Sequence, residues 1–303
     1  MELQFKEKFI ERYKQLTDWD AYAEECKKRL RKAIRVNTIK ISIKDLKKRM
    51  EDQGFKLVQV PWCKEGFWIT GDRTDLGNLM EHALGYFYVQ EAASMIPPVV
   101  LDPQENDTVV DVAAAPGSKT TQLGQYMHNT GLIVANDVTG DRLASLGINV
   151  QRMGLKNVVV TKTKGQFLKG SFDRILLDAP CSGTGTIMKS EAVVRDWNPD
   201  SAERLSMLQK RLITSAFNNL KKGGTMVYST CTMEPQENEG VVSFLLEKYP
   251  DAKLEEIKLD IKRSPCILSF DKETYNPEVS KCLRIWPQDN NTEGFFVARI
   301  RKE

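Results

Sequence analysis

The sequence is poor in the residues from which metal centres are usually built. It contains two histidines, His82 and His128, and none of its six cysteines belongs to a CxxC pair. Zinc sites in proteins draw most of their ligands from these two residue types. A metal site is therefore not expected, and free thiols are expected at all six cysteine positions, which are Cys26, Cys63, Cys181, Cys231, Cys266 and Cys282.

Long hydrophobic runs, internal repeats and a secretory signal are also missing. No apolar run approaches the roughly 20 residues that a membrane-spanning helix needs. The N-terminal stretch MELQFKEKFIERYKQL mixes charged and apolar residues at helical spacing, unlike a signal peptide. The 303 residues, 41% hydrophobic and 28% charged, suffice for one large or two smaller globular domains. A cytoplasmic monomer without membrane contact is the default expectation.

The net charge is small, but basic residues gather near the N-terminus. The formal charge is +3 for the whole chain, whereas residues 1–55 hold 15 Lys and Arg against 10 Asp and Glu. The densest runs are KKRLRK at 27–32 and KDLKKRM at 44–50. Such runs fit either a surface for a polyanion or the solvated faces of ordinary helices, and charge alone favours neither.

Residues 1–105 are expected to form a smaller N-terminal region of basic helices and short aromatic-rich strands. The segment 42–54, SIKDLKKRMEDQG, predicts a helix with Ser42 as its N-cap. The segment 61–70, PWCKEGFWIT, predicts a pair of strands. Its aromatic residues are expected to pack in a core, although stacking on RNA bases is an alternative. They are Trp62, Phe67 and Trp68.

Residues 106–303 alternate between predicted strands and helices. Strands are predicted at 108–113, 131–138, 157–162, 172–180, 225–230 and 294–302, and helices at 118–127, 141–154, 201–224 and 238–250. This alternation predicts an α/β domain with a mostly parallel sheet and helices on both faces. Ligands of such sheets bind at the carboxyl ends of the strands, where several polar residues of this sequence fall.

One of these strand ends carries a cofactor signal, DVAAAPGSKTTQLG at 111–124. Its small residues lead directly into a helix, whose N-terminus favours negative groups. The segment lacks the GxGxxG pattern of dinucleotide folds, and Ser118 interrupts the Gly-Lys pair of a phosphate-binding loop. S-adenosylmethionine is the remaining class. Asp137, at the end of the next strand, could accept hydrogen bonds from its ribose hydroxyls or be a satisfied turn residue.

Two cysteines stand in unusually polar, turn-forming surroundings, in DAPCSGTG at 178–185 and in YSTCTM at 228–233. Each cysteine alone could be a packing residue. Methylation at C5 of cytosine, however, needs a thiolate that adds to C6, a carboxyl group at N3, and a base or second thiol so that the C5 proton is lost and the thiolate can leave. Asp178, Cys181 and Cys231 supply this set at the ends of strands in one sheet.

Together with IRVNTIK at 34–40 and GYFYVQEAASMIP at 85–97, these motifs resemble the Sun-type RNA cytosine-5 methyltransferases over nearly the whole chain. The resemblance implies a Rossmann-like methyltransferase fold with a mostly parallel seven-stranded sheet. It also implies a smaller N-terminal α+β extension that binds RNA, so that residues 1–105 would be the RNA-binding region and residues 106–303 the catalytic domain.

The resemblance assigns a role to each matching residue. Cys231 would be the nucleophile, Cys181 would assist product release, Asp178 would contact the N3/N4 edge of cytosine, and Lys119 would orient the site. S-adenosylmethionine would be held by the loop at 113–119, by Asp137 at the end of the second strand, by Arg142 in the helix after it, and by Asp178. The loop and helix residues are Ala113, Ala114, Ala115, Pro116, Gly117, Ser118, Lys119, Asp137 and Arg142.

The sequence departs from the family where an acidic residue usually follows the third strand. Lys164 lies near that position, so the adenine contact stays unassigned. DNA cytosine-5 methyltransferases place their nucleophile in a Pro-Cys pair, which would make Cys181 the attacking residue. A non-catalytic RNA-binding protein is an alternative of another class. A cysteine hydrolase is disfavoured because no histidine stands in a partnering motif.

The RNA substrate is expected to be tRNA rather than ribosomal RNA. The sequence ends at residue 303, directly after the last predicted strand. Short family members of this kind resemble archaeal tRNA-modifying enzymes, whereas bacterial ribosomal RNA enzymes tend to carry extra domains. The position of the methylated cytosine cannot be predicted from the sequence.

Overall fold

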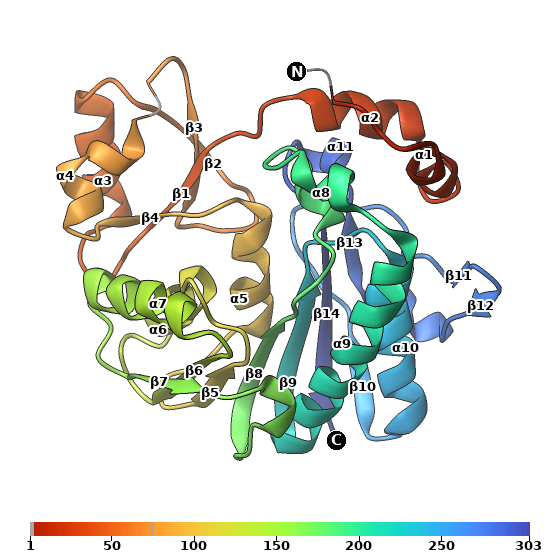
Figure 1. Cartoon of the computed structure of the whole chain (residues 1–303). Coiled ribbons are helices and arrows are strands. Elements are labelled where there is room, and N and C mark those ends of the chain that lie inside the picture. The colour runs from red at the N-terminus through yellow and green to blue at the C-terminus, as the bar shows by residue number, and fades with distance from the viewer. Residues whose placement is uncertain (1–2, 74) are drawn as a thin grey trace.

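A small and a large β-sheet organise the computed structural model, which describes residues 3–73 and 75–303 (Figure 1). The small sheet is antiparallel with the strand order β2-β3-β1-β4. Its strands are β1 (Ala33–Val36), β2 (Lys56–Gln59), β3 (Gly66–Thr70) and β4 (Phe87–Val89), and the helices beside it are α3 (Ile43–Asp52) and α4 (Met80–Ala83). As predicted, Ser42 caps α3 by accepting a hydrogen bond from Asp45 N at 3.1 Å.

The large sheet has eight strands, seven of them in the order β10-β14-β9-β8-β5-β6-β7. The strands are β5 (Thr108–Asp111), β6 (Leu132–Asp137), β7 (Val158–Lys162), β8 (Phe172–Asp178), β9 (Leu220–Thr230), β10 (Ala252–Glu255), β13 (Leu283–Ile285) and β14 (Phe295–Lys302). The five adjacent strands β9, β8, β5, β6 and β7 are parallel to one another, whereas β14 runs antiparallel to β9, β10 and β13. The predicted mostly parallel sheet is confirmed, and β13 adds an eighth strand.

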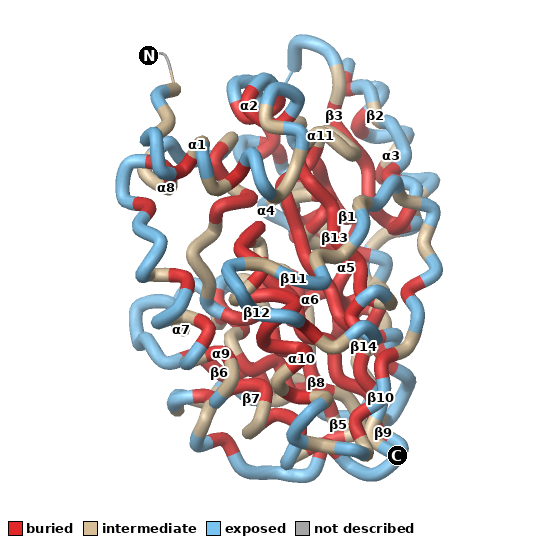
Figure 2. The backbone as a smooth tube through the Cα atoms, turned by 90° about the vertical axis from the view of Figure 1, so that its right-hand side faces the viewer, coloured by how far each residue is buried: buried red, intermediate tan, exposed pale blue. Residues whose placement is uncertain are grey.

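Helices cover both faces of the large sheet. On one face lie α5 (Ile96–Leu101) and α6 (Ser118–Tyr126), with α7 (Gly140–Met153) beside α6, and on the other α9 (Pro199–Asn219) and α10 (Glu239–Lys248). A hydrophobic core lies on each face of the sheet, and alternate residues of a strand pack in the two cores. In β8, Leu176 packs on the α5 side and Leu177 on the α9 side. Figure 2 shows the buried positions gathered in the strands and in the inner sides of these helices.

The N-terminal helices pack against elements of the C-terminal part of the molecule. Helices α1 (Glu7–Tyr13) and α2 (Trp19–Lys27) lie next to α8 (Ala192–Asp196) and α11 (Pro287–Asn290), apart from the small sheet (Figure 1). A cluster of aromatic rings joins them, made of Phe9, Tyr13, Tyr22, Trp197 and Trp286. A small hairpin, β11 (Ser269–Phe270) and β12 (Glu273–Thr274), completes the elements.

Two predicted elements differ from the structure. The pair of strands expected at 61–70 is wrong, because residues 61–65 form the turn that joins β2 to β3, closed by Val60 N donating to Gly66 O at 2.9 Å. The helix expected to end at Gly224 ends at Asn219, because Leu220 is extended and begins β9 by pairing with Phe172. Within the described residues, no helix is both long and apolar enough to cross a membrane.

Candidate active site

The predicted cofactor loop joins β5 to α6 at the carboxyl end of the large sheet. Residues 112–117, VAAAPG, form the loop, and α6 begins at Ser118. Gly117 has a φ of 106°, and a Cβ atom there would lie 2.9 Å from Leu146 Cδ1. Both the backbone angle and the close approach therefore require glycine. A short loop that leads into a helix N-terminus is an arrangement that favours nucleotide-like and anionic ligands.

Asp137 and Arg142 lie against this loop, as predicted. Asp137 Oδ2 accepts a hydrogen bond from Ala115 N at 3.2 Å, and its Oδ1 accepts one from Val138 N at 2.8 Å. Arg142 Nη2 donates to Ala115 O at 2.6 Å, and its Nη1 lies 3.6 Å from Asp137 Oδ2. The carboxylate at the end of β6 thus faces the loop that follows β5.

Asp111, at the end of β5, keeps one oxygen without a partner. Its Oδ2 accepts a hydrogen bond from Thr120 Oγ1 at 2.7 Å, whereas Oδ1 is buried and receives no hydrogen bond. Burial raises the pKa of Asp111 to about 7, and the nearby Asp178 carboxylate adds to the shift. A buried acceptor with no donor in the protein fits a ligand that brings its own N–H or O–H group.

An ion pair connects α6 to the end of β8. Lys119 Nζ lies 2.8 Å from Asp178 Oδ2 and donates to Ser94 Oγ at 2.9 Å. Burial alone would lower the pKa of Lys119, but the Asp178 carboxylate outweighs burial and the pKa is raised. Asp178 Oδ1 accepts a further hydrogen bond from Ser229 Oγ at 2.7 Å. The Asp178 side chain keeps 28% of its surface exposed, so it remains accessible to a substrate.

Two cysteines meet where β8 and β9 end. Asp178 and Ser229 are paired neighbours in the two strands, and the loop after each strand carries a cysteine. Cys181 Sγ and Cys231 Sγ lie 3.4 Å apart, and both thiols are free. The loops are tied by backbone hydrogen bonds from Ala179 N to Ser229 O at 2.8 Å and from Gly185 N to Cys231 O at 2.9 Å.

The contact between the two thiols affects the protonation of Cys181. The contact with Cys231 and burial raise the pKa of Cys181 well above the usual range, so Cys181 holds its proton at neutral pH. A thiol that keeps its proton is a poor nucleophile but a source of a proton. The other four cysteines are also free, as expected, and lie away from this site.

Sequence reasoning missed several residues that support the site. Ser94, in the short helix Ala93–Met95, binds Lys119, yet the motif that contains it gave no signal of this contact. Arg35 of β1 is fully buried, and it donates to Ser118 O at 2.7 Å and to Thr121 Oγ1 at 2.9 Å. The small sheet is thereby fixed to the first turn of α6. Glu237, six residues after Cys231 in the sequence, hydrogen-bonds to the loop of Cys181.

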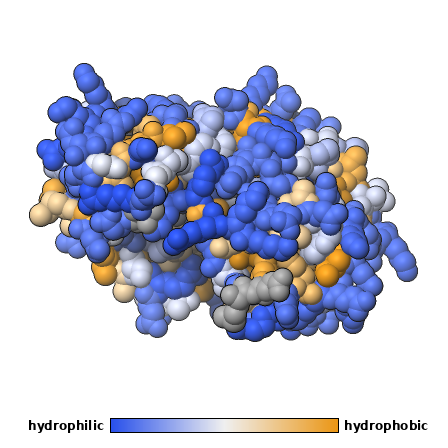
Figure 3. All heavy atoms as spheres, turned by 90° about the horizontal axis from the view of Figure 1, so that it is seen from above, coloured by the Kyte–Doolittle hydropathy of each residue, from blue (hydrophilic) through white to orange (hydrophobic). Residues whose placement is uncertain are grey.

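The N-terminal region presents charge rather than aromatic surface. The three aromatic residues of segment 61–70 are at most 7% exposed, so the expectation of core packing is confirmed. In the run 27–32, the exposed residues are Lys27, Lys28, Arg29 and Lys32. The molecule seen from above, on the side of α1 and α2, is largely hydrophilic with small hydrophobic patches (Figure 3).

Two models of known protein families match this chain, one in each part. Residues 98–301 match the family model described as 16S rRNA methyltransferase RsmB/F, and residues 5–92 match the N-terminal domain of 16S rRNA methyltransferase RsmF. The chain belongs to the RsmB/F family of RNA methyltransferases. The predicted membership of the Sun-type RNA cytosine-5 methyltransferases is thereby confirmed.

Two relatives match more than nine tenths of this chain. A tRNA (cytosine(49)-C(5))-methyltransferase of Pyrococcus abyssi is 48% identical over 299 residues, which cover 97% of this chain and 96% of the relative. A ribosomal RNA small subunit methyltransferase F of Aeromonas salmonicida is 44% identical over 93% of this chain, but the match spans only 60% of that protein.

Solved structures of the family share the fold. A methyltransferase homologue from Pyrococcus horikoshii superposes with a TM-score of 0.90 at 39% identity, covering 99% of this chain and 96% of the other. NSun6 from Pyrococcus horikoshii, in a crystal structure with SFG, gives a TM-score of 0.87 at 26% identity over 100% of this chain and 99% of NSun6. The predicted Rossmann-like methyltransferase fold with an N-terminal extension is confirmed.

Proposed function

We propose that this chain transfers a methyl group from S-adenosylmethionine to C5 of a cytosine in tRNA. The observation that carries the proposal is the pair of free thiols 3.4 Å apart beside the Lys119–Asp178 ion pair, in a member of the RsmB/F family. One thiol, a second sulfur and a carboxylate at adjacent strand ends are the groups that methylation at this carbon needs.

The residues around the loop after β5 fit the cofactor. The small side chains of residues 113–117 would border it, Asp137 would accept hydrogen bonds from ribose hydroxyls, and Arg142 would steady the loop. The buried Asp111 Oδ1, which accepts no hydrogen bond from the described side chains, would accept one from the ammonium group of the cofactor. When bound, S-adenosylmethionine supplies an electrophilic methyl group at the site of the two cysteines.

Cys231 acts as the nucleophile in this proposal. Its sulfur adds to C6 and forms an S–C6 bond, and the electron pair of the C5=C6 double bond makes C5 nucleophilic. Asp178 and Lys119 hold the N3/N4 edge of the base and stabilise the charge that develops there. Once C5 carries the methyl group, a base removes the C5 proton, the S–C6 bond breaks and the double bond re-forms. The Cys231 thiolate is thereby regenerated.

Cys181 serves release of the product rather than attack. The contact with Cys231 and burial raise its pKa, so in this proposal its proton is available to the sulfur of Cys231. A thiol 3.4 Å from the bonded sulfur is well placed to promote the elimination that frees Cys231.

The N-terminal region provides the surface for RNA in this proposal. The exposed basic residues of segments 27–32 and 44–50 would contact phosphates, while the reactive cytosine leaves its stack to reach the sulfurs. Binding would then weaken steeply with salt. Hydroxyl-radical footprinting with site-directed cleavage from residues 27–50 tests this surface, and RNA contacts located elsewhere would contradict it.

The 48% identity to a tRNA methyltransferase along its whole length favours tRNA, and the 44% identity to ribosomal RNA enzymes supports small-subunit rRNA as the second candidate. The test supplies the purified chain with labelled S-adenosylmethionine and either tRNA transcripts or small-subunit rRNA, followed by bisulfite sequencing. We expect one methylated cytosine in tRNA and none with the Cys231→Ala variant. Label only in rRNA would favour the second candidate, and no label in either would indicate a non-catalytic binding protein.

A further inference from the structure

A buried carboxylate outside the expected set of site residues lies behind the two cysteines. Glu237 ends the short helix Pro235–Glu237, which follows the Cys231 loop (residues 231–234). Its side chain is completely buried. No cation lies within ion-pair distance of it among the described residues, and burial raises its pKa to about 7. Burying a carboxylate without a counter-ion is unfavourable unless hydrogen bonds satisfy it.

The hydrogen bonds of Glu237 reach the other cysteine loop. Its Oε2 accepts from Ser182 N at 3.0 Å and from Gln209 Nε2 at 2.8 Å, and its Oε1 accepts from Ser182 Oγ. Ser182 directly follows Cys181 in the Cys181 loop (residues 179–186). Gln209 Nε2 also donates to Pro180 O at 2.9 Å, on the other side of Cys181. Both neighbours of Cys181 are thus fixed by one carboxylate and one amide.

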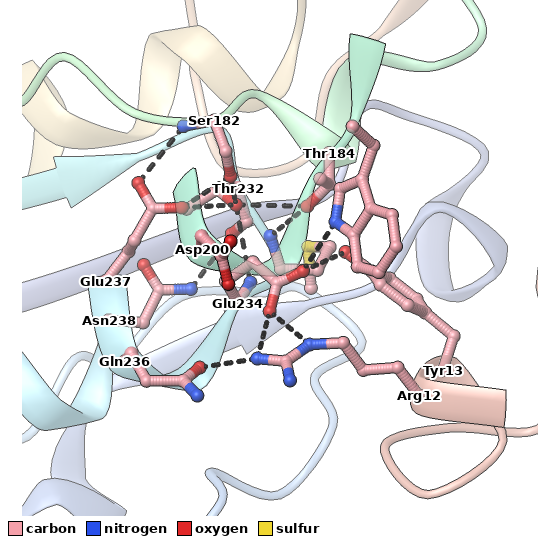
Figure 4. A network of polar contacts seen from close by, with 12 residues as sticks. Arg12, Tyr13, Ser182, Thr184, Asp200, Thr232, Glu234, Gln236, Glu237 and Asn238 are labelled. Atoms are coloured by element: carbon pink, nitrogen blue, oxygen red, sulfur yellow. Dashed lines mark hydrogen bonds and ion pairs between the residues drawn. The ribbon is translucent and has the colours of Figure 1, made fainter. Parts of the chain in front are cut away.

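A chain of hydroxyl groups then crosses between the two loops (Figure 4). Ser182 Oγ donates to Glu237 Oε1, and Thr232 Oγ1 lies 2.7 Å from Ser182 Oγ and donates to the same carboxylate oxygen at 3.5 Å. Thr184 Oγ1 lies 3.0 Å from Thr232 Oγ1 and accepts from Met233 N at 2.9 Å. The hydroxyl groups come alternately from the two loops. Thr184, Thr232 and Glu237 are fully buried.

We propose that Glu237 is a positioning residue that sets the separation between the attacking sulfur of Cys231 and the releasing sulfur of Cys181. The proposal rests on the proposed function, because it assigns a role to both sulfurs. Glu237 acts through Ser182 and Thr232, each the immediate neighbour of a cysteine. Its loss would let the loops drift apart, and release would suffer most because Cys181 must act on a bond that Cys231 has already formed.

The test compares two substitutions of the same residue. Glu237→Leu removes every acceptor, whereas Glu237→Gln keeps the size and allows the hydroxyl chain to reverse its direction. A misplacement of about 1 Å at a reacting group lowers a rate about 100-fold, so we expect kcat to fall about 100-fold in Glu237→Leu, with KM for RNA nearly unchanged. Covalent complex on unmodified RNA should accumulate, and we expect a stronger accumulation in Cys181→Ala, which lacks the releasing thiol. Glu237→Gln should keep kcat within a few-fold.

Two further variants separate positioning from stability. Ser182→Ala removes only the hydroxyl link and should also raise the fraction of trapped RNA, which decides the question if Glu237→Leu does not fold. Leu245→Ala, a buried change on α10 away from both loops, should lower the melting temperature without changing that fraction.

Each outcome bears on the proposal. An unchanged kcat and trapped fraction in Glu237→Leu, or an unchanged fraction in Ser182→Ala, would overturn it, as would the same accumulation in Leu245→Ala. If the unaltered chain formed no adduct with 5-fluorocytosine RNA, the proposed function itself would fail, and this role with it.

Discussion

Asp178 forms the main polar contacts of the site: it pairs with Lys119, accepts a hydrogen bond from Ser229 and keeps part of its side chain exposed. Its replacement by asparagine keeps the shape but leaves the buried Lys119 ammonium without its counter-ion. We expect Asp178→Asn to lower kcat at least ~100-fold, the range for loss of one group that stabilises developing charge, while RNA binding changes little. Steady-state kinetics together with fluorescence anisotropy measures both quantities.

Asp173→Asn is the matched control, because Asp173 lies in the same strand and pairs with Lys221 at the opposite end. It should leave kcat near that of the unaltered chain. A kcat for Asp178→Asn within about threefold of normal would contradict the assigned role, since a group that stabilises developing charge contributes far more than that.

Local sequence patterns identified the side chains that meet at the candidate site but not the residues that support them. The cysteines, Asp178 and Lys119 stand in short motifs whose composition reflects their chemistry. Ser94 lies in a quoted motif and Glu237 lies four residues after another, but their partners are 25 and 55 residues away in the sequence. Which side chain meets which across such a separation is decided by how elements pack, and no periodicity of hydrophobic residues contains that information.

Helix α1 is tied to the Cys231 loop through a buried ion pair. Arg12 Nη2 lies 2.7 Å from Glu234 Oε2, and Glu234 also accepts from Trp197 Nε1 at 3.1 Å (Figure 4). We expect Arg12→Met to destabilise the fold by about 3 kcal/mol, because it leaves a buried carboxylate without its cation. The double variant Arg12→Met/Glu234→Gln should recover much of this loss. Urea unfolding monitored by tryptophan fluorescence gives the free energies.

An exposed ion pair offers the comparison for this prediction. Arg195 and Asp196 lie close together with both side chains mostly exposed, so Arg195→Met should leave the free energy of unfolding nearly unchanged. Equal losses for the two single variants, or no recovery in the double variant, would show that burial does not set the strength of the α1 contact.

Most elements of the large sheet followed from the sequence because strands and helices alternate there with clear periods. The errors fell where local preference and tertiary pairing disagree. Residues 220–224 continue a helical pattern, yet they extend β9 because Leu220 pairs with Phe172. Likewise, segment 61–70 has the composition of strands throughout, but its first half must turn so that β3 can pair with both β1 and β2.

The whole molecule should be more stable at mildly acidic than at alkaline pH. Burial raises the pKa of Glu91 to about 8 and those of Asp111 and Glu237 to about 7. A raised carboxyl pKa means that the folded state binds protons more tightly than the unfolded state. The stabilising contribution is therefore complete below about pH 4 and is lost as the pH rises through 7 to 8.

Glu237→Gln isolates one of these contributions. The free energy of unfolding, measured in urea between pH 5 and 8, should fall less steeply for this variant than for the unaltered chain. His82 has a lowered pKa, which makes the free energy of unfolding rise with pH. This contribution is the same in both proteins and cancels in the comparison. Identical slopes would mean that Glu237 does not titrate in this range.

The most direct measurement is the identity of the residue that bonds to the RNA. The chain is incubated with S-adenosylmethionine and 5-fluorocytosine-containing tRNA, digested with protease and nuclease, and analysed by mass spectrometry. We expect the nucleotide on the peptide that contains Cys231, and we expect Cys181→Ala to remain bonded even to unmodified RNA. A nucleotide on the Cys181 peptide, or on neither, would contradict the central role of Cys231.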